Sequence, residues 1–219
     1  MNKRSKIALV AVALVGASAV AFAVVAEHSG FLKGDPVLAQ LQVGTPAPDF
    51  RATDVNGRPV SLSDFRGRTV VLEWSNPECP TVRKHYDSGN MQRTQAAAAA
   101  AGTVWLTINS SAEGNQGHMT PEQARTFAAG QPSRRTAYLL DPEGIVGRRY
   151  GATATPHMFV VNAAGNLVYN GAIDDKPSTD PEDIQGARNH VLAALGDLRA
   201  GRPVAVPTSR PYGCSVKYG

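Results

Sequence analysis

The chain has 219 residues, and its 22 lysines and arginines against 18 acidic residues give a formal net charge of only +4. It has no block of like charges and no basic run interleaved with aromatics, which argues against nucleic acid as a partner. Two cysteines are too few for a disulfide-dense scaffold, but they are enough for one bridge or one redox pair.

The N-terminal 26 residues differ from the rest of the chain. Lys3, Arg4 and Lys6 precede an uncharged, mostly apolar run over residues 7–26. This pattern is typical of an export signal, and a run of this length is also long enough to span a bilayer. A cleaved signal peptide and an uncleaved membrane anchor both remain open, and both predict that the rest of the chain is exported.

The next segments are expected to lead into one globular domain. Residues 27–43 contain glycine and proline with little periodicity, which predicts a linker, and residues 44–202 suit a single hydrophobic core. "VGTPAPDF" opens the domain with prolines that favour extended backbone. Asn56-Gly57, between short alternating runs, predicts a β-hairpin, and "RTVVLEWS" predicts a buried strand.

Helix and strand patterns then alternate to the end of the domain. A helix is expected from Pro80 to about Ala101, because proline suits a first helical turn. The later segments are predicted as strands at 103–109, 136–141 and within 157–173, and as helices at 118–130, 142–151 and 180–201. This order predicts an α/β sheet with crossover helices, followed by an extended, proline-rich tail over residues 203–219.

Cys79 is a candidate reactive thiol because of its position. It follows a predicted strand and precedes a predicted helix, in "WSNPECPTVRKHY". Unpaired N–H groups at a helix N-terminus favour the thiolate and lower the pKa of a cysteine there. In "ATATPHMFVV", Thr155-Pro156 precedes a strand, where either a cis proline or a trans proline at the first strand residue would fit.

These segments together resemble the thioredoxin-like superfamily, and most closely the peroxiredoxin-like branch of the redoxin (AhpC/TSA-type) proteins. The resemblance rests on "VGTPAPDF", "GRPVSLSDFRGRTVVLEWSNPECPTVRK", "YGATATPHMFVVNAAGNLVYNGAIDD" and "YGCSVKY", in that order. It implies a thioredoxin-like fold, with a central mixed sheet flanked by helices, an N-terminal hairpin extension and an extended C-terminal tail. It also implies that Cys79 lies in the active-site turn, beside a cis Pro156 and a Thr155 whose backbone pairs with a bound partner.

Two departures from the family pattern limit what the resemblance carries over. In "CPTV" the fourth position is Val82, so the adjacent second cysteine of thioredoxin is absent. The same position holds the peroxidatic cysteine in typical peroxiredoxins, so no peroxidase triad is transferred to this chain.

Cys214, in the terminal "GCSVKY", is the only other cysteine. An extended tail of about 18 residues can span tens of ångströms and bring Cys214 to Cys79. We expect a reversible disulfide in which Cys79 attacks and Cys214 resolves. A permanent structural bridge and two unpaired or intermolecular cysteines are the alternatives.

Other polar residues near the motifs have both a chemical and a structural interpretation. Glu73 is a candidate proton acceptor or a salt-bridge partner of a helix residue, Trp74 a candidate contact for substrate, and His157 a candidate acid or base facing the cysteine. His85 and His118 are expected to face solvent, and Asp174-Asp175 to be a solvated loop pair rather than a cation site. We expect no metal and no cofactor.

The sequence thus predicts an exported thiol–disulfide oxidoreductase, periplasmic or extracytoplasmic, either soluble or tethered through residues 7–26. Its expected partners are protein thiols and disulfides or small hydroperoxides, with a thioredoxin-type electron donor. Two alternatives remain, a single-cysteine peroxidase acting on hydroperoxides and a non-enzymatic, disulfide-stapled binding module.

Overall fold

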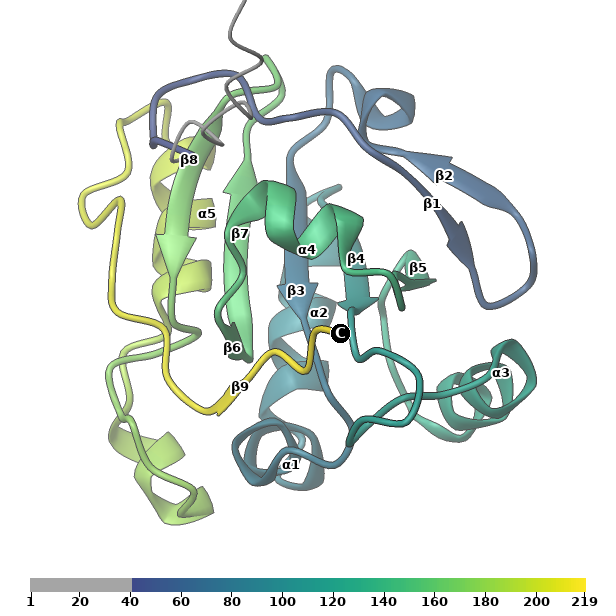
Figure 1. The fold of residues 1–219 in the computed structure, drawn as a ribbon. Coiled ribbons are helices and arrows are strands. Elements are labelled where there is room, and N and C mark those ends of the chain that lie inside the picture. Colours follow the sequence, from purple (N-terminus) through teal and green to yellow (C-terminus); the bar gives the residue numbers. More distant parts are fainter. Residues whose placement is uncertain (1–40) are drawn as a thin grey trace, which may run out of the picture. The chain divides into compact units, whose positions relative to one another are not determined.

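The computed structural model describes residues 41–219, and the predicted leader at 1–26 and most of the predicted linker at 27–43 lie outside this range. A seven-stranded mixed sheet forms the centre, in the order β2-β1-β5-β4-β3-β7-β8 (Figure 1). Its strands are β1 (Arg51–Asp54), β2 (Pro59–Ser61), β3 (Val70–Trp74), β4 (Val104–Asn109), β5 (Ala137–Leu140), β7 (His157–Val161) and β8 (Leu167–Gly171). Two short strands, β6 (Ala154–Thr155) and β9 (Cys214–Ser215), pair with each other outside this sheet.

Helices cover both faces of the sheet, as Figure 1 shows, with α2 and α5 on one face and α4 on the other. The helices are α1 (Pro80–Asp87), α2 (Asn90–Ala100), α3 (Pro121–Gly130), α4 (Ile145–Tyr150) and α5 (His190–Arg199), with 3-10 turns at Leu62–Phe65 and Pro181–Gly186. β3 pairs in parallel with β4 and antiparallel with β7. The mixed sheet flanked by helices confirms the predicted thioredoxin-like fold.

The alternation of side chains along β3 separates two hydrophobic cores. Leu72 and Trp74 pack into the core on the α4 side, and Val71 packs into the core that also holds Cys79. All five residues of β3 are buried, because the strand lies in the middle of the sheet with helices on both faces. Leu41 and Val43, predicted as the end of the linker, pack against the core on the α4 side.

The predicted hairpin extension is confirmed, and it occupies one edge of the sheet. β1 and β2 pair antiparallel around the Asn56-Gly57 turn, and β1 then pairs antiparallel with β5. Gly57 has φ +78°, a conformation that costs glycine little and most other residues more.

Two predicted long helices are each divided into two pieces. The helix expected over residues 80–101 is interrupted after Asp87 by Gly89, which has φ +73° and precedes α2. The helix expected over 180–201 is a 3-10 turn followed by α5, whose first turn is capped by Asn189 accepting from the Leu192 N–H at 2.9 Å. In both cases a turn residue favours a new helix start over a continuous helix.

Candidate functional site

The turn between β3 and α1 positions Cys79. Cys79 is the N-cap residue of α1, with Pro80 at the first helical position, as the sequence predicts. Asn76 fixes the turn, since its amide donates to the Gln116 carbonyl at 3.0 Å and its side-chain oxygen accepts from the Glu78 N–H at 2.8 Å. Because Asn76 is only 1 % exposed, these contacts are shielded from competing water.

The Cys79 thiol points away from solvent, toward the segment that precedes β7. Its side chain has no exposed surface, and its Sγ donates to the Thr155 carbonyl oxygen at 3.1 Å. The Thr155–Pro156 peptide bond is cis, which confirms that expectation. Cys79 and the cis proline are therefore neighbours, although 76 residues separate Cys79 from Thr155.

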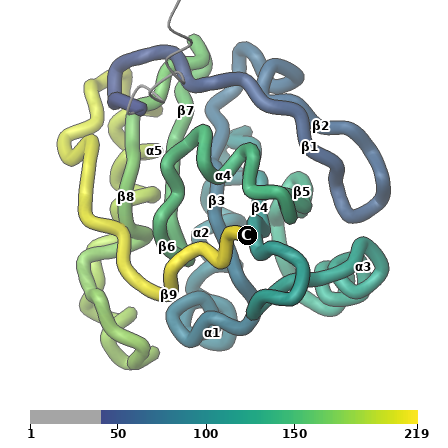
Figure 2. The backbone as a smooth tube through the Cα atoms, viewed as in Figure 1, coloured from purple at the N-terminus to yellow at the C-terminus, as the bar shows by residue number. Residues whose placement is uncertain are grey.

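The C-terminal tail brings Cys214 to the same place. β9 pairs antiparallel with β6, with Thr155 opposite Cys214 and Ala154 opposite Ser215. Figure 2 follows the tail along β8 and then below β7 to the end of the chain beside α4. Both cysteines are free thiols, Cys79 buried and Cys214 partly exposed.

Gly213 allows this close approach of two backbones. It has φ +118°, and a Cβ atom there would lie 2.1 Å from the Thr155 carbonyl oxygen. No other residue type fits this position without moving the tail, because both the dihedral angle and the contact exclude a side chain. The glycine before Cys214 is therefore a structural requirement for the β6–β9 pairing.

The pKa values of the two thiols are shifted in opposite directions. Burial raises the pKa of Cys79, but hydrogen bonds from the side chains of Cys214 and Thr155 and from the backbone of Val82 and Cys214 outweigh it and lower the pKa. Burial, together with the hydrogen bond to Cys79 and the charge of Cys79, raises the pKa of Cys214 to about 11. The pair thus favours a thiolate on Cys79 and a proton on Cys214.

The comparisons with known proteins agree with this fold. The family model described as Redoxin matches residues 42–187. The chain belongs to the Redoxin family. It is 21 % identical over 175 residues to the thiol-disulfide oxidoreductase ResA of Bacillus cereus (strain ATCC 10987 / NRS 248), covering 77 % of this chain and 88 % of ResA.

Solved structures resemble this redoxin over most of its length. An uncharacterized conserved protein from Geobacillus kaustophilus superposes with a TM-score of 0.67 at 27 % identity, covering 83 % of this chain and 94 % of that one. A putative thiol:disulfide interchange protein DsbE from Chlorobium tepidum superposes with a TM-score of 0.53 at 28 % identity, covering 71 % and 99 %. The chain is therefore a thioredoxin-like redoxin.

Thr155 and Trp74, both predicted to contact substrate, contact other parts of the protein itself. The backbone edge at Thr155 is occupied by the protein's own Cys214. Trp74 has no exposed surface, donates from Nε1 to Ser110 Oγ at 3.0 Å and packs against Tyr150 and Phe159. A side chain without exposed surface cannot touch a docked partner, so in this conformation Trp74 is a core residue rather than a substrate contact.

Glu73 is buried among neutral donors. Its carboxylate accepts from Tyr86 Oη at 2.8 Å, Trp105 Nε1 at 2.7 Å and Thr107 Oγ1 at 3.0 Å. No ion pair involves Glu73 within residues 41–219, so the expected salt bridge to a helix residue is absent there. The carboxylate instead ties α1 to the sheet, because Tyr86 belongs to α1 and Trp105 to β4.

The ring nitrogens of His157 contact Thr153 and Asn170 of β8, and no hydrogen bond joins His157 to Cys79 among the described residues. Its Nδ1 accepts from the Thr153 N–H at 3.2 Å, and its Nε2 lies 2.7 Å from Asn170 Oδ1. Burial lowers the pKa of His157 to about 4, although the hydrogen bond to Asn170 opposes this. With both ring nitrogens engaged and the ring neutral, His157 has no nitrogen free to serve Cys79.

His85 and Asp174 were predicted to face solvent, and both predictions are wrong. His85 has no exposed surface, and Asp174 is 2 % exposed, so only Asp175 of the acidic pair faces solvent. His85 is on α1, where it faces the loop after β8 and the tail, and Asp174 is the residue of that loop that it meets. His118 is half-buried, and its Nδ1 lies 3.1 Å from the Ser111 carbonyl oxygen.

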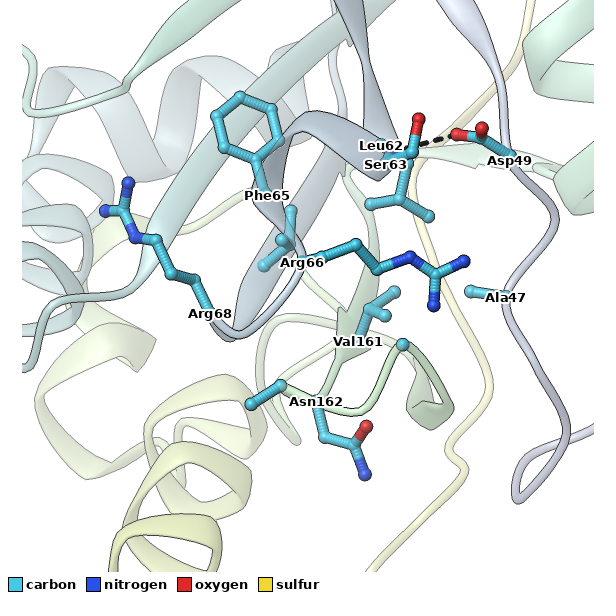
Figure 3. Close-up of a pocket in the computed structure, with 12 residues that line it drawn as sticks. Ala47, Asp49, Leu62, Ser63, Phe65, Arg66, Arg68, Val161 and Asn162 are labelled. Atoms are coloured by element: carbon cyan, nitrogen blue, oxygen red, sulfur yellow. Dashed lines mark hydrogen bonds between the residues drawn. The ribbon is translucent and has the colours of Figure 1, made fainter.

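A cavity of about 150 Å³ lies beside the turn that carries Cys79, lined among others by Ser75, Pro77 and Val82, and Cys79 itself does not line it. The recess in Figure 3, between Ala47, Ser63, Arg66 and Asn162, has a volume of about 10 Å³, room for about one water molecule, and lies away from both cysteines.

In residues 41–219 no three His, Cys, Asp or Glu side chains form a set that could bind a metal. Within the same range no helix is long and apolar enough to cross a membrane, and the apolar run at 7–26 lies outside it.

The sequence reasoning missed three residues that shape the site. Asn76 fixes the cysteine turn, Gly213 permits the tail to pair, and Tyr212 anchors the tail through Asp174. An Asn-Pro step between a strand and a helix is a turn signal that could have identified Asn76. No local signal identifies the partner of Tyr212, because Asp174 is 38 residues away in the chain.

The acidity of Cys79 should depend on Cys214. Cys214→Ala removes a hydrogen-bond donor to the thiolate, so we expect the pKa of Cys79 to rise, and the thiolate absorbance near 240 nm to appear at higher pH than in the wild type. Cys214→Ser keeps a hydroxyl donor, so the pKa of Cys79 in this variant should lie between the values in the wild type and in Cys214→Ala. A pKa of Cys79 that is the same in all three proteins would show that Cys214 does not stabilise the thiolate.

Gly213→Ala should detach β9 from β6, because the new Cβ collides with the Thr155 carbonyl oxygen. We expect Cys79 to react with iodoacetamide at least about tenfold faster than in the wild type, measured by mass spectrometry under reducing conditions. Gly201→Ala is the matched control, since Gly201 also has positive φ, +67°, but open space around its Cβ position. Equal rates in the two variants would mean that the contact between Gly213 and Thr155 does not control access to Cys79.

Proposed function

We propose that this redoxin is a thiol–disulfide oxidoreductase in which Cys79 is the nucleophile and Cys214 the resolving thiol. The single observation that supports this most strongly is the pairing of Cys214 with Thr155, directly beside the buried Cys79. The thiol–disulfide oxidoreductases among its relatives support the same class of reaction. While the tail is paired, the lowered pKa of Cys79 and the raised pKa of Cys214 suit a nucleophile and a resolving partner, and release of the tail removes the contribution of Cys214 to the lowered pKa of Cys79.

In the proposed reaction the Cys79 thiolate attacks one sulfur of a partner's disulfide. That S–S bond breaks, a mixed disulfide forms at Cys79, and the partner's other sulfur leaves as a thiolate and takes a proton. Cys214 then loses its proton and attacks Cys79 Sγ, which forms the Cys79–Cys214 disulfide and releases the partner's second thiolate. Two electrons pass from the cysteine pair to the partner, and a thioredoxin-type dithiol donor restores the pair.

The first step requires the tail to move. Cys79 has no exposed surface while β9 is paired with β6, and an attacking thiolate needs direct access to the sulfur that it attacks. The edge at Thr155 and Pro156 then becomes available to the extended chain of a protein partner, which is the role that the family resemblance implies for it.

The reduction potential of the cysteine pair tests this proposal. The full chain is equilibrated with glutathione or dithiothreitol buffers, and the Cys79–Cys214 disulfide is quantified by alkylation and mass spectrometry. We expect a potential between about −120 and −270 mV, the range of catalytic exchange proteins. A value far below about −300 mV would instead indicate a structural bridge and the stapled binding module.

Two cysteine variants are the controls for this measurement. Cys214→Ser should accumulate a mixed disulfide with glutathione at Cys79, whereas Cys79→Ser should not form the intramolecular bridge. If no disulfide forms in the wild type, but hydroperoxide converts Cys79 rapidly and stoichiometrically to a sulfenic acid, the peroxidase alternative replaces the proposal.

We further propose that the chain is exported, with residues 1–26 as a signal peptide or an anchor, 27–43 as a linker, 44–202 as the redoxin domain and 203–219 as the tail. The basic start and the uncharged run at 7–26 support this proposal. Fractionation of expressing cells, with mass spectrometry of the chain, should find it outside the cytoplasm, shortened at its N-terminus if the signal is cleaved and complete in the membrane fraction if it is an anchor. A complete chain in the cytoplasmic fraction would contradict export.

A further inference from the structure

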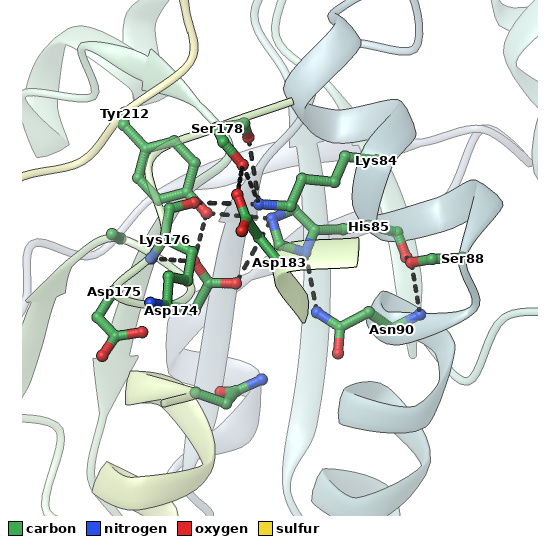
Figure 4. A network of polar contacts seen from close by, with 12 residues as sticks. Lys84, His85, Ser88, Asn90, Asp174, Asp175, Lys176, Ser178, Asp183 and Tyr212 are labelled. Atoms are coloured by element: carbon green, nitrogen blue, oxygen red, sulfur yellow. Dashed lines mark hydrogen bonds and ion pairs between the residues drawn. The ribbon is translucent and has the colours of Figure 1, made fainter. Parts of the chain in front are cut away.

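A buried polar cluster joins three segments that are far apart in the sequence. We call His85, Asp174 and Tyr212 the clasp; they come from α1, from the loop after β8 and from the tail. Figure 4 shows the three side chains converging, with Lys84 and Ser178 beside them. The thiol chemistry proposed above uses none of these side chains.

The clasp is a chain of hydrogen bonds with one consistent direction. The Asn90 amide donates to His85 Nδ1 at 2.8 Å, so His85 Nε2 carries the ring proton and can donate to Tyr212 Oη, which lies 3.3 Å away. Tyr212 Oη in turn donates to Asp174 Oδ1. The tail is therefore held by a hydroxyl that accepts from the helix and donates to the loop.

The protonation states of the clasp support this direction. Burial lowers the pKa of His85 to about 4, with the charge of Asp174 opposing and that of Lys84 adding to the shift, so the ring is neutral near pH 7. Burial raises the pKa of Tyr212, and the hydrogen bond and charge of Asp174 raise it further. Tyr212 therefore keeps its proton and remains a donor to the carboxylate.

Lys84 fixes the loop that carries Asp174. Its ammonium group donates to the carbonyl oxygens of Lys176 at 3.0 Å and Ser178 at 3.2 Å, and to Ser178 Oγ at 3.2 Å. Lys84 is only 4 % exposed, so these charge-assisted bonds are shielded from solvent. Its Nζ also lies 5.8 Å from the centre of the Tyr212 ring.

The clasp joins the two segments that carry the cysteines. Cys79 is the N-cap of the helix that contains His85, and Tyr212 precedes Cys214 by two residues, with Gly213 between them. We propose that Tyr212 is a positioning residue, which holds Cys214 on the Thr155 edge through Asp174 and His85 and whose release opens that edge to the extended chain of a protein partner. This inference rests on the proposed function, because it assigns the tail the role of a removable occupant of the partner's binding edge.

Release of Tyr212 would change two measurable properties of Cys79 together. Cys79 would lose the hydrogen bonds from Cys214 that stabilise its thiolate, and it would become accessible to reagents. A residue with a merely structural role would change stability without changing either property.

The test compares Tyr212→Phe with Tyr218→Phe in the full-length protein under reducing conditions. Tyr212→Phe keeps the ring beside Lys84 and removes only the hydroxyl. Tyr218→Phe is the matched control, because it also removes one tail hydroxyl, which donates to the Ala152 carbonyl oxygen at 2.8 Å. The readouts are the pKa of Cys79 from thiolate absorbance and its iodoacetamide rate at a pH where it is fully ionised.

We expect Tyr212→Phe to raise the pKa of Cys79 and to speed its alkylation by about tenfold or more, as the loss of a hydrogen bond to a buried carboxylate predicts. Tyr218→Phe should stay within about twofold of the wild type in both readouts. Wild-type values in Tyr212→Phe, or equal changes in the two variants, would overturn the proposal. If Tyr212→Phe does not fold, Asp174→Asn, which removes the acceptor's charge, provides the same readouts and the same criteria.

The outcome separates the clasp from the proposed function. If the wild-type cysteines exchange with glutathione as expected but Tyr212→Phe behaves as the wild type, the clasp proposal fails and the function stands. If Tyr212→Phe exposes Cys79 while the wild-type pair forms no reversible disulfide, the proposed function fails and Tyr212 is still what holds the tail in place.

Discussion

The main-chain pairing between Thr155 and Cys214 is the contact on which the rest of the site depends. It brings the second thiol to a cysteine 135 residues earlier in the chain, covers the Cys79 sulfur and supplies donors that stabilise its thiolate. The pairing is possible because position 213 has no side chain. One short pair of strands thus brings the two thiols together beside the cis proline.

Helix α1 is the common support of this arrangement. Its N-terminus carries Cys79, Tyr86 binds the buried carboxylate of Glu73 in the sheet, and His85 meets Asp174 and the tail. Two buried carboxylates therefore lie against the helix on two sides. Both oxygens of Glu73 accept hydrogen bonds. Asp174 Oδ1 accepts from Tyr212 and from the Lys176 N–H, whereas Asp174 Oδ2 lies 3.9 Å from His85 Nε2 and has no hydrogen-bond partner among the described residues.

Local sequence signals predicted the elements well where the signal lay within the element itself. The Asn56-Gly57 hairpin, the buried strand before Cys79 and the start of α1 at Pro80 are all where they were expected. The expected helices over 80–101 and 180–201 were too long, because Gly89 and Asn189 act as helix boundaries inside amphipathic patterns. An amphipathic pattern shows which face is buried, but it does not show whether the backbone is continuous.

The sequence by itself determined the alternation of strands and helices and the location of Cys79 at a helix N-terminus, because strand, cap and turn preferences act within a few residues. The thioredoxin-like class and the cis proline beside Cys79 were implied by the family resemblance. The tertiary structure alone decided that the tail pairs with Thr155, that Trp74 lies in the core and that His85 and Asp174 are buried together. Such contacts join residues tens of positions apart, and their free energy depends on which groups exclude water around them. No local pattern carries that information, so a histidine and an aspartate expected in solvent became the buried anchor of the segment that carries Cys214.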